Sequence, residues 1–125
     1  TFDEYLAANP NTRAIWWQMC VPRDDEPTFE DALKIVAGVK DRIPGATVYV
    51  SALPSYQEGE CRITGTTGLS RGSALARELA AQGGVQPGPE LGAHAPSEVQ
   101  GDGCHLTDEG MRSVGEQLKQ FFDSL

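Results

Sequence analysis

Two short apolar segments that flank one long amphipathic segment constrain the fold more than any other feature of this sequence. Residues 13–19 (RAIWWQM) contain a continuous apolar run, and residues 46–53 (ATVYVSAL) are apolar and β-branched. Between them, residues 28–43 begin with Thr28 and Asp31 at the spacing of a helix cap and then repeat apolar residues on one helical face. Because the links are short, the sequence predicts a strand–helix–strand unit with parallel strands and a right-handed crossover, and therefore an α/β fold.

Three other segments are expected to be helices, the first from Thr1 and Glu4 at the spacing of a capping box and the other two from apolar residues at helical spacing. They are residues 1–8, a segment that starts at Ser70 or Ser73 and ends at Gln82, and residues 107–125. Residues 54–67 are expected to be a loop with one weak strand signal around Ile63. The Gly- and Pro-rich residues 83–103 are expected to be mostly irregular, with a short extended piece around Val85 and Leu91.

The sequence predicts only two strong strands, although these strands look as if they lie inside a larger sheet. Trp16 and Trp17 are adjacent, so their side chains point to opposite faces, and an apolar residue on each face suggests a central strand that is covered on both sides. A central strand needs a neighbour at each edge. We therefore expect further strands before Thr1, which stands where an intact chain would have Met, or else pairing with a second copy.

Composition excludes several classes of function. Ten Lys and Arg against 18 Asp and Glu give a net charge of −8, which repels phosphate backbones and anionic lipid surfaces. We therefore expect no nucleic-acid partner. No apolar run approaches the roughly 20 residues of a membrane span, and no signal-peptide core is present.

The three cysteines, Cys20, Cys61 and Cys104, leave two interpretations open. They could be buried free thiols of a cytosolic protein. Alternatively, Cys61 and Cys104, which both lie in polar, Gly-rich loops, form a disulfide in an exported protein. In that case Cys20 is free or pairs with a segment outside this chain.

The most informative short motif is Asp102–His105, just before the last predicted helix. An Asp three residues before a His on a Gly-rich turn can fold back so that its carboxylate accepts a hydrogen bond from the imidazole. That contact would fix the tautomer and leave the other ring nitrogen free as a base. The alternative is a loop Asp that caps the turn beside a solvated His.

The string DGCHLTDEG at residues 102–110 resembles the last conserved block of the SGNH/GDSL hydrolases. The preceding order of buried strand, loop, long helix, Pro-Gly and a second strand ending in Leu-Pro is similar to that family as well. Residues 61–65 (CRITG) and 68–72 (GLSRG) resemble secreted actinobacterial members. The resemblance implies a three-layer α/β/α, flavodoxin-like domain, of which residues 1–125 would be the C-terminal part, and localisation outside the bacterial cell.

The resemblance also implies a function. His105 would be the general base towards a serine hydroxyl and Asp102 its orienting partner, in the hydrolysis of a small ester or an acylated carbohydrate or lipid through an acyl-enzyme, without cofactor or metal. Two departures matter. The chain contains no Gly-Asp-Ser block, so the nucleophile would precede Thr1, and residues 20–25 (CVPRDD) lack the family's oxyanion-hole Asn. The alternative is therefore a non-catalytic domain of this type that binds carbohydrate or has a structural role.

A second catalytic interpretation involves Ser70. Gly68-Leu69-Ser70-Arg71-Gly72 matches a nucleophile elbow, and Ser70 followed by Asp102 and His105 has the order of an α/β-hydrolase triad. An elbow requires a buried strand directly before it, however, and residues 62–67 (RITGTT) contain a single apolar residue. A position at the start of a helix is the better interpretation of Ser70.

The other polar candidates are weaker. Asp24, Asp25 and Glu26 could bind a cation but are more typical of a solvated loop. His94 could contact substrate, although a solvated loop His is the simpler interpretation. Ser51 and Ser55 lie at the carboxyl end of the second strand, where they could line an active-site crevice without taking part in the chemistry.

Overall fold

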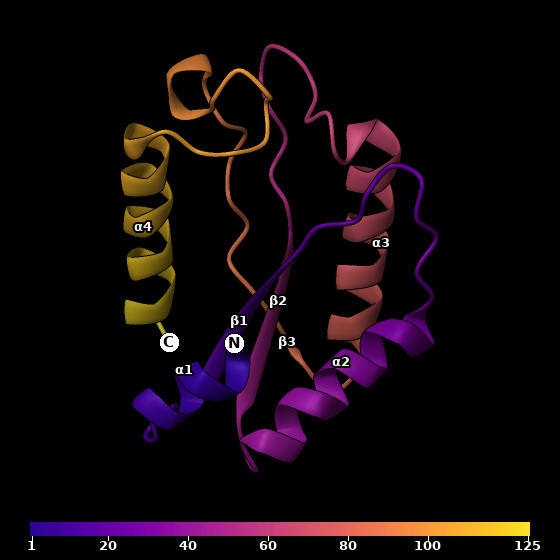
Figure 1. Cartoon of the computed structure of the whole chain (residues 1–125), viewed down its shortest axis with the longest axis vertical. Helices are drawn as coiled ribbons and strands as arrows, with labels where there is room; N and C mark the ends of the chain where they lie inside the picture. Colours follow the sequence, from indigo (N-terminus) through magenta and orange to yellow (C-terminus); the bar gives the residue numbers. More distant parts are fainter.

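The strand–helix–strand unit is present as predicted. The computed structural model describes residues 1–125 and has an α/β fold (Figure 1). Strands β1 (Ala14–Met19) and β2 (Thr47–Ala52) are parallel, with Ala14 opposite Thr47 and Met19 opposite Ala52. Helix α2 (Phe29–Arg42) connects them. A short third strand, β3 (Gln86–Pro87), pairs in parallel with β2, so the strand order is β1-β2-β3.

Three other α-helices and one 3₁₀ turn complete the chain. They are α1 (Phe2–Ala8), α3 (Gly65–Gln82), the 3₁₀ turn η1 (Pro96–Glu98) and α4 (Asp108–Asp123). Threonine hydroxyls cap three of the four α-helices by accepting a hydrogen bond from the N3 backbone N–H. The capping residues are Thr1, Thr28 and Thr107. Because such a cap satisfies a backbone donor that has no partner within the helix, these three helix starts follow directly from the sequence.

Helices lie on both sides of the sheet, which Figure 1 shows nearly edge-on. The main core lies between the sheet and the helices α2 and α3. Its buried members are Met19, Val21, Ala32, Val36, Val48, Val50, Leu75, Ala76, Leu79 and Val85. On the other side α4 packs through Phe121 and Phe122, whose rings meet Tyr49 of β2 edge to face at centroid distances of 5.9 and 5.3 Å.

Helix α3 starts at Gly65, earlier than the expected start at Ser70 or Ser73. The first turns of the helix pack closely at Gly68. A Cβ on Gly68 would lie 2.0 Å from the carbonyl oxygen of Val21, and Gly72 faces the carbonyl of Met19. The helix therefore packs against the backbone that leaves β1 more closely than a side chain would permit. No strand forms around Ile63, whose carbonyl instead accepts a hydrogen bond from the Arg23 N–H.

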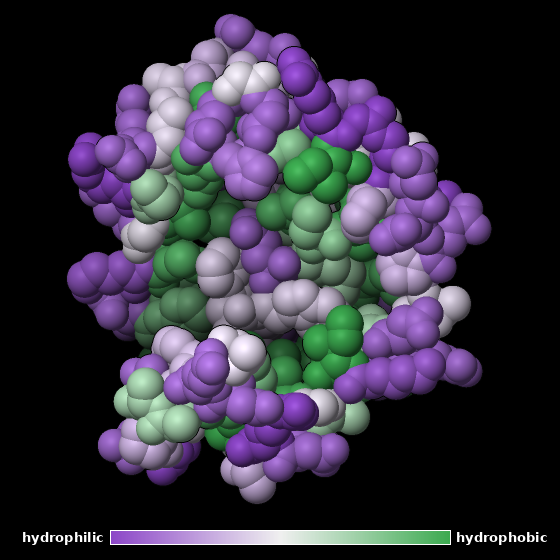
Figure 2. Space-filling model, in the orientation of Figure 1, coloured by the Kyte–Doolittle hydropathy of each residue, from purple (hydrophilic) through white to green (hydrophobic).

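Strand β1 lies at the edge of the sheet, so one of its edges has no strand partner within this chain, as the sequence predicts. Its Trp16 and Trp17 are half-buried, and the Trp16 indole donates to the Ser51 hydroxyl at 2.7 Å. Figure 2 shows the molecule hollowed between the two groups of helices, with hydrophobic residues inside the hollow. None of the helices has the length and apolar character needed to cross a membrane.

Candidate functional site

Asp102 and His105 make the contact that the sequence predicts. The Asp102 Oδ2 and His105 Nδ1 atoms are 2.5 Å apart. The other carboxylate oxygen of Asp102 accepts two backbone hydrogen bonds, from Cys104 N at 2.9 Å and His105 N at 3.0 Å. The His105 side chain is 67% exposed, against 34% for Asp102. One ring nitrogen of His105 is thus held by the protein, and the other edge of the ring faces solvent.

The turn between the two residues depends on Gly103. This residue has φ +70°, and a Cβ at this position would lie 2.9 Å from the Glu60 carbonyl oxygen. Both observations favour glycine, because an L side chain is disfavoured at that φ and no space exists for it. The sharp turn brings the Asp102 carboxylate back onto the following N–H groups and onto the imidazole.

Three donors lower the pKa of Asp102 to about 2. In order of size, the causes are the backbone hydrogen bond from Cys104, the bond with the His105 side chain and the backbone bond from His105. The carboxylate is therefore ionised at neutral pH and requires a proton on His105 Nδ1. In the neutral ring, Nε2 is then an acceptor and can work as a base.

The segment that carries Asp102 is anchored on one side by a disulfide. Cys61 and Cys104 are bonded, as the loop positions of the two cysteines suggested, and Cys20 is free and exposed. Beside the disulfide, the Arg62 N–H donates to the Asp102 carbonyl at 3.3 Å. The pair is therefore covalently fixed to the loop that leads into α3.

On the other side the segment is anchored to η1 and α4. The Gln100 N–H donates to the His105 carbonyl at 2.8 Å, and the Thr107 N–H donates to the Glu98 carbonyl at 3.0 Å. The Thr107 hydroxyl, whose oxygen also caps α4, donates to the Ser97 carbonyl at 2.7 Å. Anchors on both sides keep an exposed His in one geometry, which is what a catalytic base requires.

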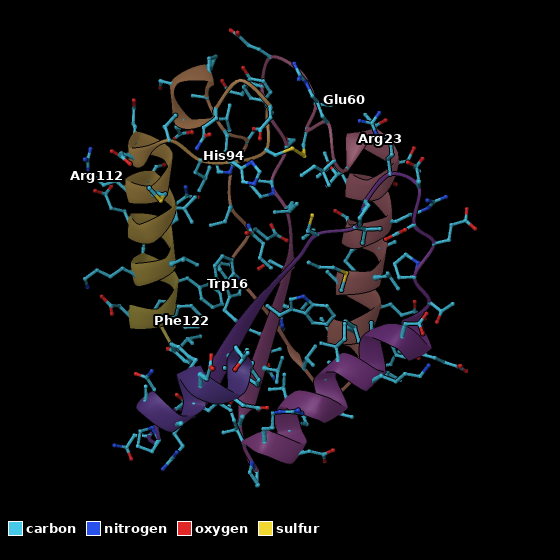
Figure 3. All side chains as sticks on the ribbon, in the orientation of Figure 1. Trp16, Arg23, Glu60, His94, Arg112 and Phe122 are labelled. Atoms are coloured by element: carbon cyan, nitrogen blue, oxygen red, sulfur yellow. A yellow bond between two sulfur atoms is a disulfide. The ribbon has the colours of Figure 1, made fainter.

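His94 differs from the expected solvated loop residue. The residue, labelled in Figure 3, is only 7% exposed. Its Nδ1 atom lies 3.7 Å from Glu98 Oε2. The pKa of Glu98 is lowered, chiefly by a hydrogen bond from the Ser113 side chain and then by one from the Ala95 N–H. Backbone bonds join His94 to Ser55 and Gln57. No local sequence signal marked this buried pair, because its burial depends on packing between distant loops.

Ser70 does not occupy a nucleophile elbow. It is an exposed residue within α3, and no strand precedes it. In the acidic run, the Glu26 carboxylate pairs with the Arg71 guanidinium at 2.7 Å. Nowhere in the chain do three or more potential ligand side chains cluster to hold a metal ion.

Ser51 and Ser55 line a cavity, as expected from their place at the end of β2, but not beside His105. The cavity, of about 480 Å³, lies between the end of β2, helix α3 and residues 87–91. In the loop that follows β1, the N–H groups of Arg23 and Asp25 donate to the carbonyls of Ile63 and Pro22 and are therefore not free to serve as oxyanion donors.

Comparison of the chain with models of known families, with curated proteins and with solved structures gives no match.

Proposed function

We propose that this chain supplies the Asp–His pair of an SGNH/GDSL-type serine esterase. The observation that carries the proposal is the contact between Asp102 Oδ2 and His105 Nδ1 on a segment that is anchored on both sides. A base that is held by an ionised carboxylate and open to solvent fits nucleophilic catalysis better than it fits a purely structural role. The substrate would be a small ester, including acylated carbohydrates or lipids.

The chemistry would be acyl transfer to serine and then to water. His105 Nε2 would take the proton of the serine hydroxyl as the serine attacks the ester carbonyl, and would return it to the departing alcohol. Asp102 would keep Nδ1 protonated and stabilise the imidazolium. The same base would then activate the water that hydrolyses the acyl-enzyme. None of these steps requires a metal or a cofactor.

The serine would come from a segment that pairs with the free edge of β1. That edge has backbone groups without a sheet partner, and it adjoins a groove of about 670 Å³ whose lining includes the exposed side chains of Phe2, Tyr5 and Ile35. A parallel strand there would end at the same edge of the sheet as β1 and β2, and active sites of α/β sheets lie at that carboxyl edge. It would also complete a three-layer α/β/α sheet of the expected type. The segment would precede Thr1 in the same domain.

An extracellular bacterial location fits this proposal. The Cys61–Cys104 disulfide is stable in an oxidising compartment, and such bonds are rare in reducing cytosol.

Labelling with a fluorophosphonate tests the proposal. The probe would be applied to this chain and to a form extended by the sequence encoded before Thr1, followed by peptide mapping. We expect labelling only in the extended form, at a serine before Thr1, and loss of labelling in its His105→Ala variant. His105 is exposed, so this variant should fold, which circular dichroism would confirm.

The other two outcomes would each overturn the assignment. Labelling of Ser70 in the chain itself would establish the elbow instead. No labelling in either form would favour a non-catalytic domain that binds carbohydrate or has a structural role, an alternative that the absence of Asn from residues 20–25 supports.

A further inference from the structure

The cavity beside α3 has the dimensions of a small-molecule site. Its volume of about 480 Å³ falls within the range of roughly 300–1,000 Å³ that is usual for ligand pockets. Helix α3 forms one wall, the end of β2 forms another, and residues 87–91 form a third. The lining does not include Asp102, His105 or the groove beside β1.

The wall formed by residues 87–91 is held directly on the sheet. The Gly88 N–H donates to the Val50 carbonyl at 2.7 Å, and a Cβ on Gly88 would lie 2.7 Å from the Ser51 hydroxyl oxygen. Pro87 and Pro89 flank Gly88 and restrict the backbone on each side. The cavity is therefore preformed, and a ligand need not order it.

Polar side chains converge on this cavity from separate elements. Ser70, Ser73 and Arg77 lie at positions i, i+3 and i+7 of α3 and so share one helix face. Ser55 and Glu90 join them from the loops that follow β2 and β3.

None of these five side chains forms a hydrogen bond or ion pair with another part of the chain. Arg71, at the neighbouring turn of α3, differs in this respect, because its guanidinium contacts the Arg23 carbonyl, the Asp25 carbonyl and the Glu26 carboxylate. The cavity thus combines five polar side chains that have no hydrogen-bond partner within the chain with Ser51, whose hydroxyl accepts from the Trp16 indole, and with apolar residues that include Leu53, Leu69 and Ala76.

The balance of charge and hydrogen bonding indicates a neutral ligand rich in hydroxyl groups. Arg77 and Glu90 have opposite charges, so the cavity has no net charge, and the protein as a whole, at −8, repels anions. Arg77 only donates hydrogen bonds, Glu90 only accepts them, and the serines do both. A molecule whose hydroxyls both donate and accept can form hydrogen bonds with all five side chains. We propose that this cavity binds a neutral sugar or polyol, an activity that does not depend on the esterase function.

Titration followed by ¹⁵N–¹H NMR tests this proposal on the chain itself. The probes are methyl β-glucoside and myo-inositol, with glucuronate and hexanoate as comparisons. We expect saturable shifts for at least one neutral polyol at residues 50–55, 69–80 and 87–91. Arg77→Gln and Glu90→Gln should each weaken binding about tenfold, since each removes charge-assisted hydrogen bonds.

Arg112→Gln is the matched control. Arg112 is an exposed arginine of α4, outside the lining of the cavity, so this variant should bind like the parent chain. Absence of saturable shifts with both polyols would overturn the proposal. Tighter binding of glucuronate that strengthens in Glu90→Gln would identify an anion site instead, and binding of hexanoate alone would identify an apolar one.

Discussion

Asp102 shows how much a single side chain can organise when all its contacts are local. Its carboxylate accepts two backbone hydrogen bonds and holds one imidazole, and these three donors keep its pKa near 2. Because the ionised form is favoured in the folded state, folding and ionisation of this group are linked.

This linkage predicts a pH dependence of stability. The folded-state pKa of Asp102, about 2, lies below its usual value of 3.8, so the stabilisation is fully present above about pH 4 and is lost as the pH falls towards 2. In Asp102→Asn that contribution is absent at every pH. We expect urea unfolding to show a destabilised variant at pH 6 and a much smaller difference from the parent chain at pH 2.5.

Asp31→Asn provides the comparison for this prediction. Asp31 also has a pKa of about 2, because it accepts hydrogen bonds from Thr28 at the start of α2, far along the chain from His105. The difference in stability between the parent chain and Asp31→Asn should also shrink at low pH. This variant should have no effect on fluorophosphonate labelling or ester hydrolysis. A constant difference between parent and Asp102→Asn from pH 6 to pH 2.5 would contradict the linkage.

The sequence predicts the contacts of His105 but not the burial of His94. The His105 contact is predictable because Asp102, Gly103 and the cap at Thr107 all lie within a few residues of it. His94 looked like a solvated loop residue, yet it is buried beside Glu98. Its backbone is bonded to Ser55 and Gln57, which are far from it along the chain, and no local pattern encodes that packing.

Among the elements, α4 has a role beyond covering the sheet, because its first turn rests on η1. A Cβ on Gly110 would lie 2.1 Å from the Glu98 carbonyl oxygen, and the Thr107 N–H donates to the same carbonyl. The close approach of the helix to η1 therefore sets the position of the segment that carries His105. Gly115, further along the helix, has no neighbouring atom within 4 Å of its Cβ position.

Replacement by alanine should have opposite effects on stability at Gly110 and at Gly115. Gly110→Ala should destabilise the chain by about 1–3 kcal/mol, because η1 or the helix must move to admit the methyl group. Gly115→Ala should stabilise it by up to about 1 kcal/mol, since alanine favours the helix and meets no obstacle. Urea unfolding of both variants measures the contrast, and equal effects would show that α4 does not pack closely on η1.

Helix α3 marks the limit of prediction for elements. Its last part, from Ser73 to Gln82, has clear apolar spacing, whereas its first part contains three glycines and two threonines that disfavour a helix. The helix nevertheless includes Gly65–Thr67, because Gly68 can approach the Val21 carbonyl. Local propensity predicts the part of α3 whose sequence favours a helix, and tertiary contact determines where the rest of the helix begins.

At the scale of the whole molecule, the free edge of β1 is the dominant feature. The strand has an unpaired edge, and an apolar groove that includes Phe2, Tyr5 and Ile35 adjoins it. The apolar run at residues 14–17 predicts a strand that needs a neighbour at each edge, and in the structure β1 has a neighbour, β2, on one edge only. Unprotected edges of this kind promote association between chains.

We therefore expect this chain to self-associate through β1 at high concentration. Ile15→Lys, which places a charge on the strand beside the groove, should shift the chain towards monomer in sedimentation velocity. Met111→Lys is the matched control, because Met111 is an exposed apolar residue of α4 away from that groove. A parent chain that is monomeric at all concentrations would contradict this prediction.

The disulfide contributes to the stability of the whole chain because it joins residues 43 apart. In the chain-entropy model, closure of such a loop is worth about 4 kcal/mol. The double variant Cys61→Ser, Cys104→Ser should therefore unfold at lower urea concentration, and reduction of the parent chain should have a similar effect. Unfolding that is insensitive to reductant would show that the bond constrains little.

The same bond has a consequence for resistance to proteases. The segment between Cys61 and Cys104 contains all of α3, β3 and η1, so these elements lie within one covalent ring. A single cut at the exposed residues Gly92 and Ala93, which lie in an irregular stretch inside that ring, would leave both fragments attached to each other. Such a nicked molecule could keep its sheet and its Asp102–His105 pair, and the cut would become visible on a gel only after reduction.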